Sequence, residues 1–221
     1  MAATRVVAFD VNETLLDLSA LDERFEEHLG DAALRPQWFA LMLQLSFVGA
    51  ITGRYVDFSS AQRAALAMLA ERQGIELTDR GAGAIAEGMR TLPPHPDVPG
   101  ALERIRAAGF KLCALTNSPL EVVRAQLGAA GLIGHFDAVL SADQVQALKP
   151  RREPYELAAR TFGAELGEVR LVAAHAWDVA GALAAGCLAA FVARPGMVLS
   201  PLGEQPDVVG ADLAAVADQI A

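Results

Sequence analysis

The sequence predicts an α/β fold, a doubly wound parallel sheet with an inserted block of helices. Three observations lead to this prediction. A short apolar run, Arg5–Asp10, opens the chain, and helical patterning without strands then continues from Leu16 to about Met89. Beyond Phe110, apolar strand-like runs alternate with helical segments. This alternation is typical of parallel strands joined by right-handed crossovers, with helices on both faces of the sheet.

The first strand and the inserted block each have a recognisable pattern. Residues 5–10 are apolar up to a terminal acid, as in a strand that is buried on both faces. In the block, apolar residues recur at three- and four-residue steps, which indicates the buried side of a helix; they are Leu41, Leu45, Val48 and Ile51. We expect helix breaks at Gly74 and between Gly81 and Gly83. The proline-rich stretch 92–100 is typical of a stiff return to the sheet.

After this return the expected elements alternate. The strands are residues 110–116, 138–141, 169–174 and 188–193, with 208–209 as an edge strand. The helices are residues 120–130, 154–162 and 179–185, with a terminal helix from residue 211. The inserted helices should then cover the carboxyl edge of the sheet as a cap. We predict a core domain of residues 1–15 and 93–221, and a cap of residues 16–92.

Composition limits the partners and the compartment. The net charge of −9 argues against nucleic acid, whose phosphates need a basic surface, and requires a local positive site for any anionic substrate. No apolar run approaches the ~20 residues of a membrane span. The first residues lead straight into a strand, without the pattern of a signal peptide. Cys113 and Cys187 lie in apolar runs, as buried reduced thiols do. We therefore expect a cytoplasmic protein with no membrane or nucleic-acid partner.

Polar side chains gather where four of the expected strands end. Ligands of doubly wound sheets bind outside these carboxyl ends, so the residues there are candidates for a site. They are Asp10, Asn12 and Thr14; Thr116, Asn117 and Ser118; Lys149; and His175, Trp177 and Asp178. The convergence of two acids, a lysine, a histidine and several hydroxyl groups at one edge indicates an enzyme.

Four segments resemble, in order, the motifs of the haloacid dehalogenase superfamily. They are Phe9–Leu16, with the pattern Asp-x-x-x-Thr; Leu115–Asn117; Leu148–Pro150; and Val172–Asp178. Each motif is weak alone, but four in register on strand ends are a specific signal, and the resemblance covers the whole chain. The residues that follow Lys149 and Asp178, and the cap segment Arg54–Phe58, are most similar to the 2-haloacid dehalogenases.

The chain departs from the phosphatases of this superfamily in two places. Those enzymes place a second aspartate two residues after the nucleophile, where this chain has Asn12, whose amide is no general acid. They also bind Mg²⁺ with the nucleophile and usually two acids of the fourth motif. Here Ala173 or Ala174 stands at one of those places and leaves Asp178 alone. Halide leaves without a proton, so we expect dehalogenation with no metal and no cofactor.

The resemblance implies a covalent mechanism on small anionic (S)-2-haloacids, such as haloacetates and 2-halopropionates. Asp10 would attack C2, and water would cleave the resulting ester to a 2-hydroxy acid. Lys149 would keep Asp10 ionised, while Asp178 would orient Lys149 and polarise the water. Further contacts are expected with the nucleophile, the substrate or the halide; they would come from Thr14, Thr116, Asn117, Tyr155, Asn12 and Trp177. For most of these residues, a capping, turn or packing role is the alternative.

Two departures from the dehalogenase pattern concern the halide. The family has a serine and an asparagine where this chain has Ala173 and His175. The histidine could donate to halide, act as a base for water, or only hold its neighbours in place. We hypothesise that its bulk favours a small halide, fluoride included. The family's halide-binding cap arginine falls near Phe39, so we assign that role to Arg35, one helical turn away.

Two rival functions are kept. One is a Mg²⁺-dependent phosphatase or phosphonatase of the same fold, and the other is a non-catalytic protein that uses the fold for binding. EDTA-sensitive turnover of an aryl phosphate would identify the first, and indifference to Asp10→Asn would identify the second. The apolar cap segment Trp38–Ile51 further suggests a homodimer that forms through the cap.

Overall fold

The computed structural model describes residues 4–221, and within them six parallel strands form one sheet in the order β3-β2-β1-β4-β5-β6. The strands are β1 Val6–Phe9, β2 Lys111–Thr116, β3 Ala138–Ser141, β4 Val169–Ala173, β5 Leu188–Val192 and β6 Val208–Gly210. Chain order reverses on either side of β1, which is the topology of a doubly wound sheet. The predicted α/β fold is confirmed, and each expected strand is present.

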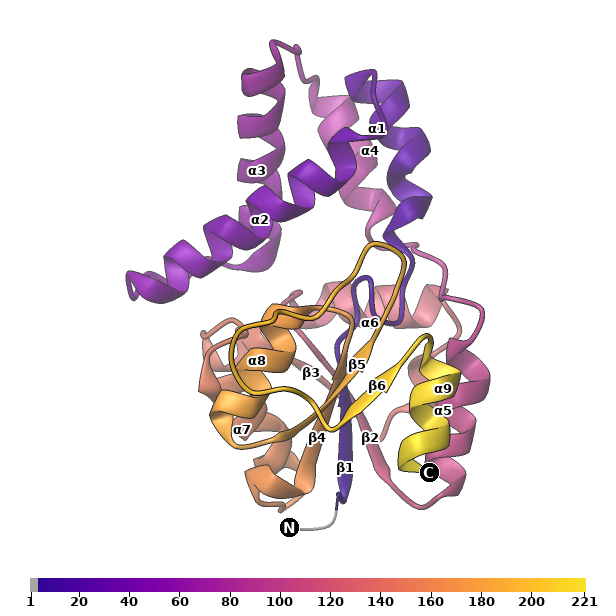
Figure 1. Cartoon of the computed structure of the whole chain (residues 1–221). Coiled ribbons are helices and arrows are strands. Elements are labelled where there is room, and N and C mark those ends of the chain that lie inside the picture. The colour runs from indigo at the N-terminus through magenta and orange to yellow at the C-terminus, as the bar shows by residue number, and fades with distance from the viewer. Residues whose placement is uncertain (1–3) are drawn as a thin grey trace.

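Helices cover both faces of the sheet (Figure 1). They are α5 Val98–Ala107, α6 Leu120–Ala129, α7 Arg152–Thr161, α8 Ala176–Ala185 and α9 Leu213–Ile220. Side chains of β1 alternate between two apolar clusters, because successive residues of a strand point to opposite faces. Val7 and Phe9 pack with α5, α6 and α9, whereas Val6 and Ala8 pack with α7 and α8. Short 3₁₀ turns join the elements at Leu18–Leu21, Ile133–His135, Ala142–Val145 and Leu166–Glu168.

The inserted block consists of helices that stand over the carboxyl edge of the sheet (Figure 1). They are α1 Asp22–Leu29, α2 Leu34–Ile51, α3 Phe58–Gln73 and α4 Asp79–Gly88. α2 packs along α3, and α1 packs along α4. Their buried residues, Trp38 and Phe25 among them, continue the apolar cluster of the α5 side without a break. We accordingly propose residues 16–92 as the cap and the two flanking segments as the core.

Three expectations about local structure were wrong. Gly81 and Gly83 lie inside α4 and do not break it, whereas Gly74 ends α3 in the left-handed conformation, as expected. The proline-rich return already becomes helix at Val98, because a proline in the first turn lacks only an N–H that would have no helical partner. The apolar face of α2 is buried at its start but not at its end, where Ile51 is 85% exposed.

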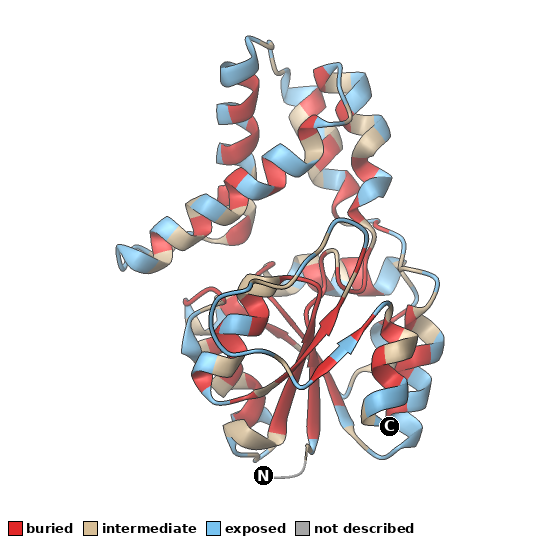
Figure 2. Ribbon diagram, viewed as in Figure 1, coloured by how far each residue is buried: buried red, intermediate tan, exposed pale blue. Residues whose placement is uncertain are grey.

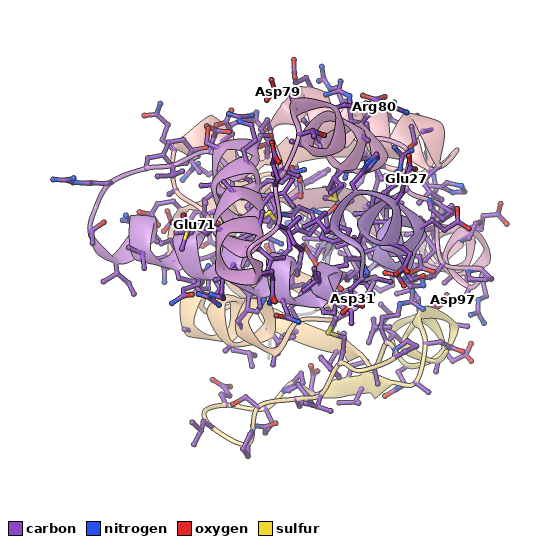
Figure 3. All side chains as sticks on the ribbon, turned by 90° about the horizontal axis from the view of Figure 1, so that it is seen from above. Glu27, Asp31, Glu71, Asp79, Arg80 and Asp97 are labelled. Atoms are coloured by element: carbon purple, nitrogen blue, oxygen red, sulfur yellow. The ribbon has the colours of Figure 1, made fainter. Side chains whose placement is uncertain are left out.

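Most apolar side chains of this molecule are buried, and most charged ones are exposed. The strands are almost entirely buried, and exposed residues lie on the outer helix faces (Figure 2). In the view from above, the exposed acids Glu27, Asp31, Glu71 and Asp79 lie on the cap (Figure 3). An anionic substrate therefore meets an acidic outer surface and needs a cationic site beneath it. Within residues 4–221, no helix is both long and apolar enough to cross a membrane.

Candidate active site

The register of the sheet places Asp10 at the centre of its carboxyl edge. Phe9 is the last residue of β1, and it is paired with Ala114 of β2 on one side and with Val172 of β4 on the other. Asp10 follows immediately, and its backbone N–H donates to the carbonyl of Val172. The ends of β2 and β4 therefore flank Asp10, and residues that follow these strands can reach its side chain.

The carboxylate of Asp10 is buried and surrounded by donors. The ammonium of Lys149 lies 2.9 Å from Oδ1, and the hydroxyl of Thr14 donates to Oδ2 over 2.7 Å. The Nδ1 atom of His175 lies 3.1 Å from the same Oδ2. Burial alone would raise the pKa of Asp10, but Lys149 and His175 outweigh it and hold the pKa well below its ordinary value. These contacts thus favour the ionised form of Asp10, which its predicted role as nucleophile requires.

Lys149 is fully buried and links two acids. Its ammonium also donates to Asp178 Oδ2 over 2.5 Å and to the carbonyl of Leu115 over 2.9 Å. Burial would lower the pKa of Lys149, but the two carboxylates raise it above its ordinary value. The hydroxyl of Tyr155 donates to the second oxygen of Asp178 over 2.6 Å. Both carboxylate oxygens of Asp178 therefore accept hydrogen bonds. This arrangement favours the predicted role of orienting Lys149 over the predicted role of polarising the water that cleaves the ester. Tyr155 reaches the site through Asp178.

The side chain of Asn117 makes two hydrogen bonds with the backbone of Lys149. The amide of Asn117 donates to the carbonyl of Lys149 over 3.2 Å and accepts from its N–H over 2.8 Å. The side chain of Asn117 is buried in this contact. In the structure, Asn117 thus positions the backbone of Lys149. The expected contact of Asn117 with halide or substrate stays a prediction.

Thr116 and Asn12, which were expected to contact the nucleophile, the substrate or the halide, hydrogen-bond other residues of the protein. The hydroxyl of Thr116 accepts from the N–H of Ser118, which is the turn role named as its alternative. The amide of Asn12 donates to the hydroxyl of Ser118 over 3.2 Å and accepts from Gln126 over 3.1 Å. Neither Thr116 nor Asn12 hydrogen-bonds Asp10 within the described structure. Thr14, by contrast, joins Asp10 to the N–H of Ala174.

His175 connects Asp10 to an acid that sequence reasoning missed. Its Nε2 lies 2.8 Å from Oε2 of Glu13, while Nδ1 faces Asp10. The imidazole also stacks against the rings of Phe39 and Trp177, with centroids 5.8 Å and 5.3 Å away. Burial would lower the pKa of His175, but hydrogen bonds to the two carboxylates raise it to about 9. His175 is thus a cation at neutral pH.

Glu13 occupies an unusual backbone conformation close to Asp10. Its φ of +61° lies in the left-handed region, which a side chain other than glycine seldom adopts. This conformation turns the loop after β1 and accompanies the contact with His175. Glu13 stands at a variable place of the first motif, so nothing in the sequence distinguishes it from a solvated acid.

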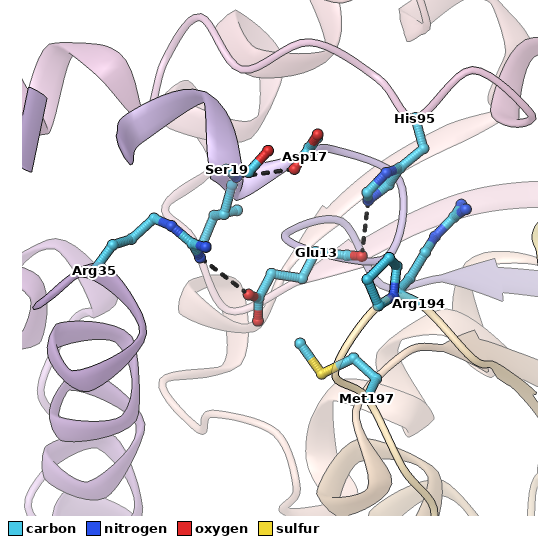
Figure 4. A pocket seen from close by; sticks show the side chains of 9 residues that line it. Glu13, Asp17, Ser19, Arg35, His95, Arg194 and Met197 are labelled. Atoms are coloured by element: carbon cyan, nitrogen blue, oxygen red, sulfur yellow. Dashed lines mark hydrogen bonds and ion pairs between the residues drawn. The ribbon is translucent and has the colours of Figure 1, made fainter. Parts of the chain in front are cut away.

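Arg35 lies on the far side of Glu13 from His175. Its Nε donates to Asp22 over 2.5 Å. Its Nη1 lies 3.7 Å from Glu13 Oε1, and this ion pair is drawn in Figure 4. Glu13 and Arg35 border a cavity of about 220 Å³. Arg35 thus reaches the site through Glu13 and makes no ion pair with Asp10 in the described structure, so its role as the halide-binding arginine stays a prediction.

Comparison with known proteins identifies the family. A profile of haloacid dehalogenase-like hydrolases matches residues 4–186. The chain belongs to this family. It is 30% identical to the (S)-2-haloacid dehalogenase of Pseudomonas sp. (strain YL), across 96% of this chain and 92% of that protein. It is 29% identical to haloacetate dehalogenase H-2 of Moraxella sp. (strain B), across 94% and 93%.

Solved structures of the family are equally similar over the full length. The L-2-haloacid dehalogenase from Xanthobacter autotrophicus with chloropropionic acid covalently bound superposes with a TM-score of 0.91, at 28% identity and 98% coverage of both chains. A defluorinating L-2-haloacid dehalogenase gives a TM-score of 0.84 at 25% identity, with 98% of this chain and 95% of that chain covered. The hydrolase thus shares its cap as well as its sheet with these proteins.

A larger cavity lies between the cap and the sheet edge of this hydrolase. Its volume is about 590 Å³, and apolar side chains form most of its wall. Phe39 and Leu43 of α2 line one side, and His175 and Trp177 line the other. The cavity therefore reaches the imidazole that touches Asp10. The indole N–H of Trp177 is buried without a hydrogen-bond partner.

The donor set of the hydrolase suits Mg²⁺ poorly. Among residues 4–221, no group of three histidines, cysteines or acids is arranged to hold a metal ion. Asp10 and Asp178 both bind the ammonium of Lys149, whereas Mg²⁺ requires several free oxygens in an octahedron. Independence from metal remains a prediction that removal of the metal must test.

Proposed function

We propose that this hydrolase removes halide from small (S)-2-haloacids through an ester on Asp10, giving a 2-hydroxy acid. One observation carries the proposal. The carboxylate at the tip of β1 is buried yet held ionised by the buried ammonium of Lys149, and Asn12 stands where a phosphatase of this superfamily has its second aspartate. The names of the similar proteins, which act on (S)-2-haloacids and haloacetate, support the same chemistry.

In the first step, Asp10 attacks C2 from the side opposite the halogen, and halide leaves with the bonding electron pair. The single displacement inverts C2. Lys149 and Thr14 hold the carboxylate in place, and they are held in turn by Asp178 and by the N–H of Ala174.

The rival phosphatase function lacks the aspartate that serves as proton donor in the phosphatases of this superfamily. The residue two places after Asp10 is Asn12, whose amide is already bonded to Ser118 and Gln126 and has no acidic proton. A phosphatase would have to protonate its leaving alcohol from another group. Halide needs no such donor.

The test is halide release by the purified, chelator-treated protein. We expect turnover of chloroacetate and (S)-2-chloropropionate, none of the (R) enantiomer, and no activity for Asp10→Asn. Asp218→Asn, a change at an acid that is 68% exposed, is the matched control and should be unaffected. Multiple turnovers in heavy-oxygen water should place the label in the side chain of Asp10. EDTA-sensitive turnover of an aryl phosphate without halide release would establish the phosphatase instead.

Fluoroacetate tests the halide preference. The bulk of His175 motivates the hypothesis that fluoride is accepted, and a defluorinating dehalogenase is among the similar structures. We expect fluoride release at a rate measurable beside that of chloride. Good activity on chloroacetate with none on fluoroacetate would contradict this hypothesis alone.

A further inference from the structure

We propose that His175 and Glu13 complete a nucleophile–base–acid triad with Asp10, in which His175 is the catalytic base and acid for ester hydrolysis and Glu13 positions it. This inference rests on the proposed function, because it concerns the second half of the same reaction. It assigns a task to the contact between His175 and Glu13, which the displacement of halide does not use.

The geometry is that of a triad. The two ring nitrogens of His175 face two different carboxylates, 3.1 Å from the nucleophile and 2.8 Å from Glu13. A base within hydrogen-bond reach of a nucleophile, itself oriented by a third group, is the general arrangement of nucleophilic catalysis. Stacking on Phe39 and Trp177 further fixes the plane of the ring. The imidazole is 6% exposed, and it borders the cavity through which water can approach.

No other group near Asp10 is free for this task. Asp178 is fully buried and has one oxygen on Lys149 and the other on Tyr155. Lys149 is held protonated by two carboxylates. Thr14 already donates to Asp10 and accepts from a backbone N–H. His175 is thus the one titratable group, among those described in contact with Asp10, that can take up and release a proton near neutral pH.

The ester step balances with these residues alone. Neutral His175 takes a proton from water as the water oxygen bonds to Cγ of the ester. Lys149, beside Oδ1, stabilises the negative charge that develops on the carbonyl oxygen. The bond from Cγ to Oδ2 then breaks, and His175 returns the proton to the departing Oδ2, which becomes the hydroxyl of the product. The new carboxylic acid gives its proton to His175, which restores the carboxylate and the imidazolium.

The charge of the site supplies a neutral base when it is needed. In the free enzyme, His175 faces Asp10 and Glu13, and these are flanked by Lys149 and Arg35. The two carboxylates raise the pKa of His175 to about 9. Ester formation removes the negative charge of Asp10. The pKa of His175 therefore falls, and its imidazolium loses a proton to solvent. Esterification itself therefore prepares the base.

His175→Ala tests the triad in a rapid-quench experiment with excess (S)-2-chloropropionate. Alanine is chosen because asparagine is the residue that the dehalogenases have at this place. We expect a burst of one chloride per active site, followed by turnover slowed about 10²- to 10⁴-fold, as for loss of a general base. Intact-protein mass spectrometry should show the accumulated ester on Asp10. His135→Ala, a change in the 3₁₀ turn before β3, is the matched control and should show no accumulation.

Glu13→Gln tests the positioning role through pH. Hydrolysis requires neutral His175, so its rate rises with pH through the pKa of His175 in the ester. Loss of the Glu13 charge lowers that pKa, and the midpoint of the profile should move down by about 1 pH unit or more. Glu121→Gln, at a side chain that is 80% exposed, should leave the midpoint in place. A merely structural role for Glu13 would lower the rate without moving the midpoint.

Several results would overturn the triad. One is a slow burst without ester accumulation in His175→Ala, since His175 would then act on the displacement of halide. Unchanged turnover in His175→Ala is another. If that variant does not fold, the Glu13→Gln variant decides: an unchanged midpoint of its pH profile would also overturn the triad. Absence of any halide release by the wild type would instead overturn the proposed function, and the triad with it.

Discussion

Lys149 shows how much of this site depends on one residue. A fully buried ammonium loses its hydration, and only nearby carboxylates and carbonyls can compensate for that loss. Here Asp10, Asp178 and the carbonyl of Leu115 do so. The same contacts keep the nucleophile ionised, so stability and reactivity depend on the same three polar groups.

Replacing this lysine should affect both properties. Lys149→Met leaves two buried carboxylates without their cation, and we expect a loss of about 3–5 kcal/mol in the free energy of unfolding. Halide release should fall below detection. Urea unfolding near neutral pH measures the first effect. Lys111→Met removes an exposed pair with Asp137 and should cost no more than ~1 kcal/mol. Equal stability of the two variants would contradict this account.

At the scale of elements, the close approach of α8 to the loop after Lys149 aligns the site. Gly181 of α8 permits this approach, because a Cβ there would lie 2.5 Å from Cβ of Pro150 and 2.6 Å from the hydroxyl of Tyr155. α7 and α8 are in direct contact along this line. Asp178 and Lys149 therefore meet only because residue 181 has no side chain.

Gly181→Ala should push these elements apart. We expect a loss of about 1–3 kcal/mol from overpacking, together with lower kcat, because the contacts of Lys149 and Tyr155 with Asp178 lengthen. Gly128→Ala is the control, since a Cβ at that helical position meets no atom within 4 Å. That change should raise stability by up to about 1 kcal/mol. A Gly181→Ala variant as stable and as active as Gly128→Ala would refute the argument.

At the scale of the whole molecule, the cap leaves an apolar end of α2 uncovered. Ile51 is 85% exposed and Val48 is 50% exposed, although the start of the same helix is buried. We keep the prediction that two copies associate through the cap, and this end of α2 is the surface we expect them to share. The cytoplasmic location also stays a prediction.

Ile51→Glu should weaken such a dimer. A charge at the centre of an apolar interface is costly, so we expect a concentration-dependent shift to monomer in light scattering. Ile133→Glu, at another exposed isoleucine outside the cap, should leave the mass unchanged. A wild-type monomer at micromolar concentration would remove the prediction altogether.

The sequence by itself determined the α/β sheet and predicted the cap and the residues that gather at the sheet edge. Buried parallel strands are continuous apolar runs, so their ends, and with them Asp10, Lys149 and Asp178, can be read along the chain. The start of α5 at Val98 could not be predicted from the sequence, because a proline-rich stretch has the sequence pattern of a turn.

Only the tertiary structure decided the contacts of Asn117, Arg35 and Glu13. Asn117 bonds the backbone of a residue 32 positions away, and Glu13 meets an imidazole 162 positions away. Local pattern carries no information on such contacts, since it reports which side chains are buried and not which polar groups pair. The path of the loop after β1, through one left-handed residue, fixes the partner of His175.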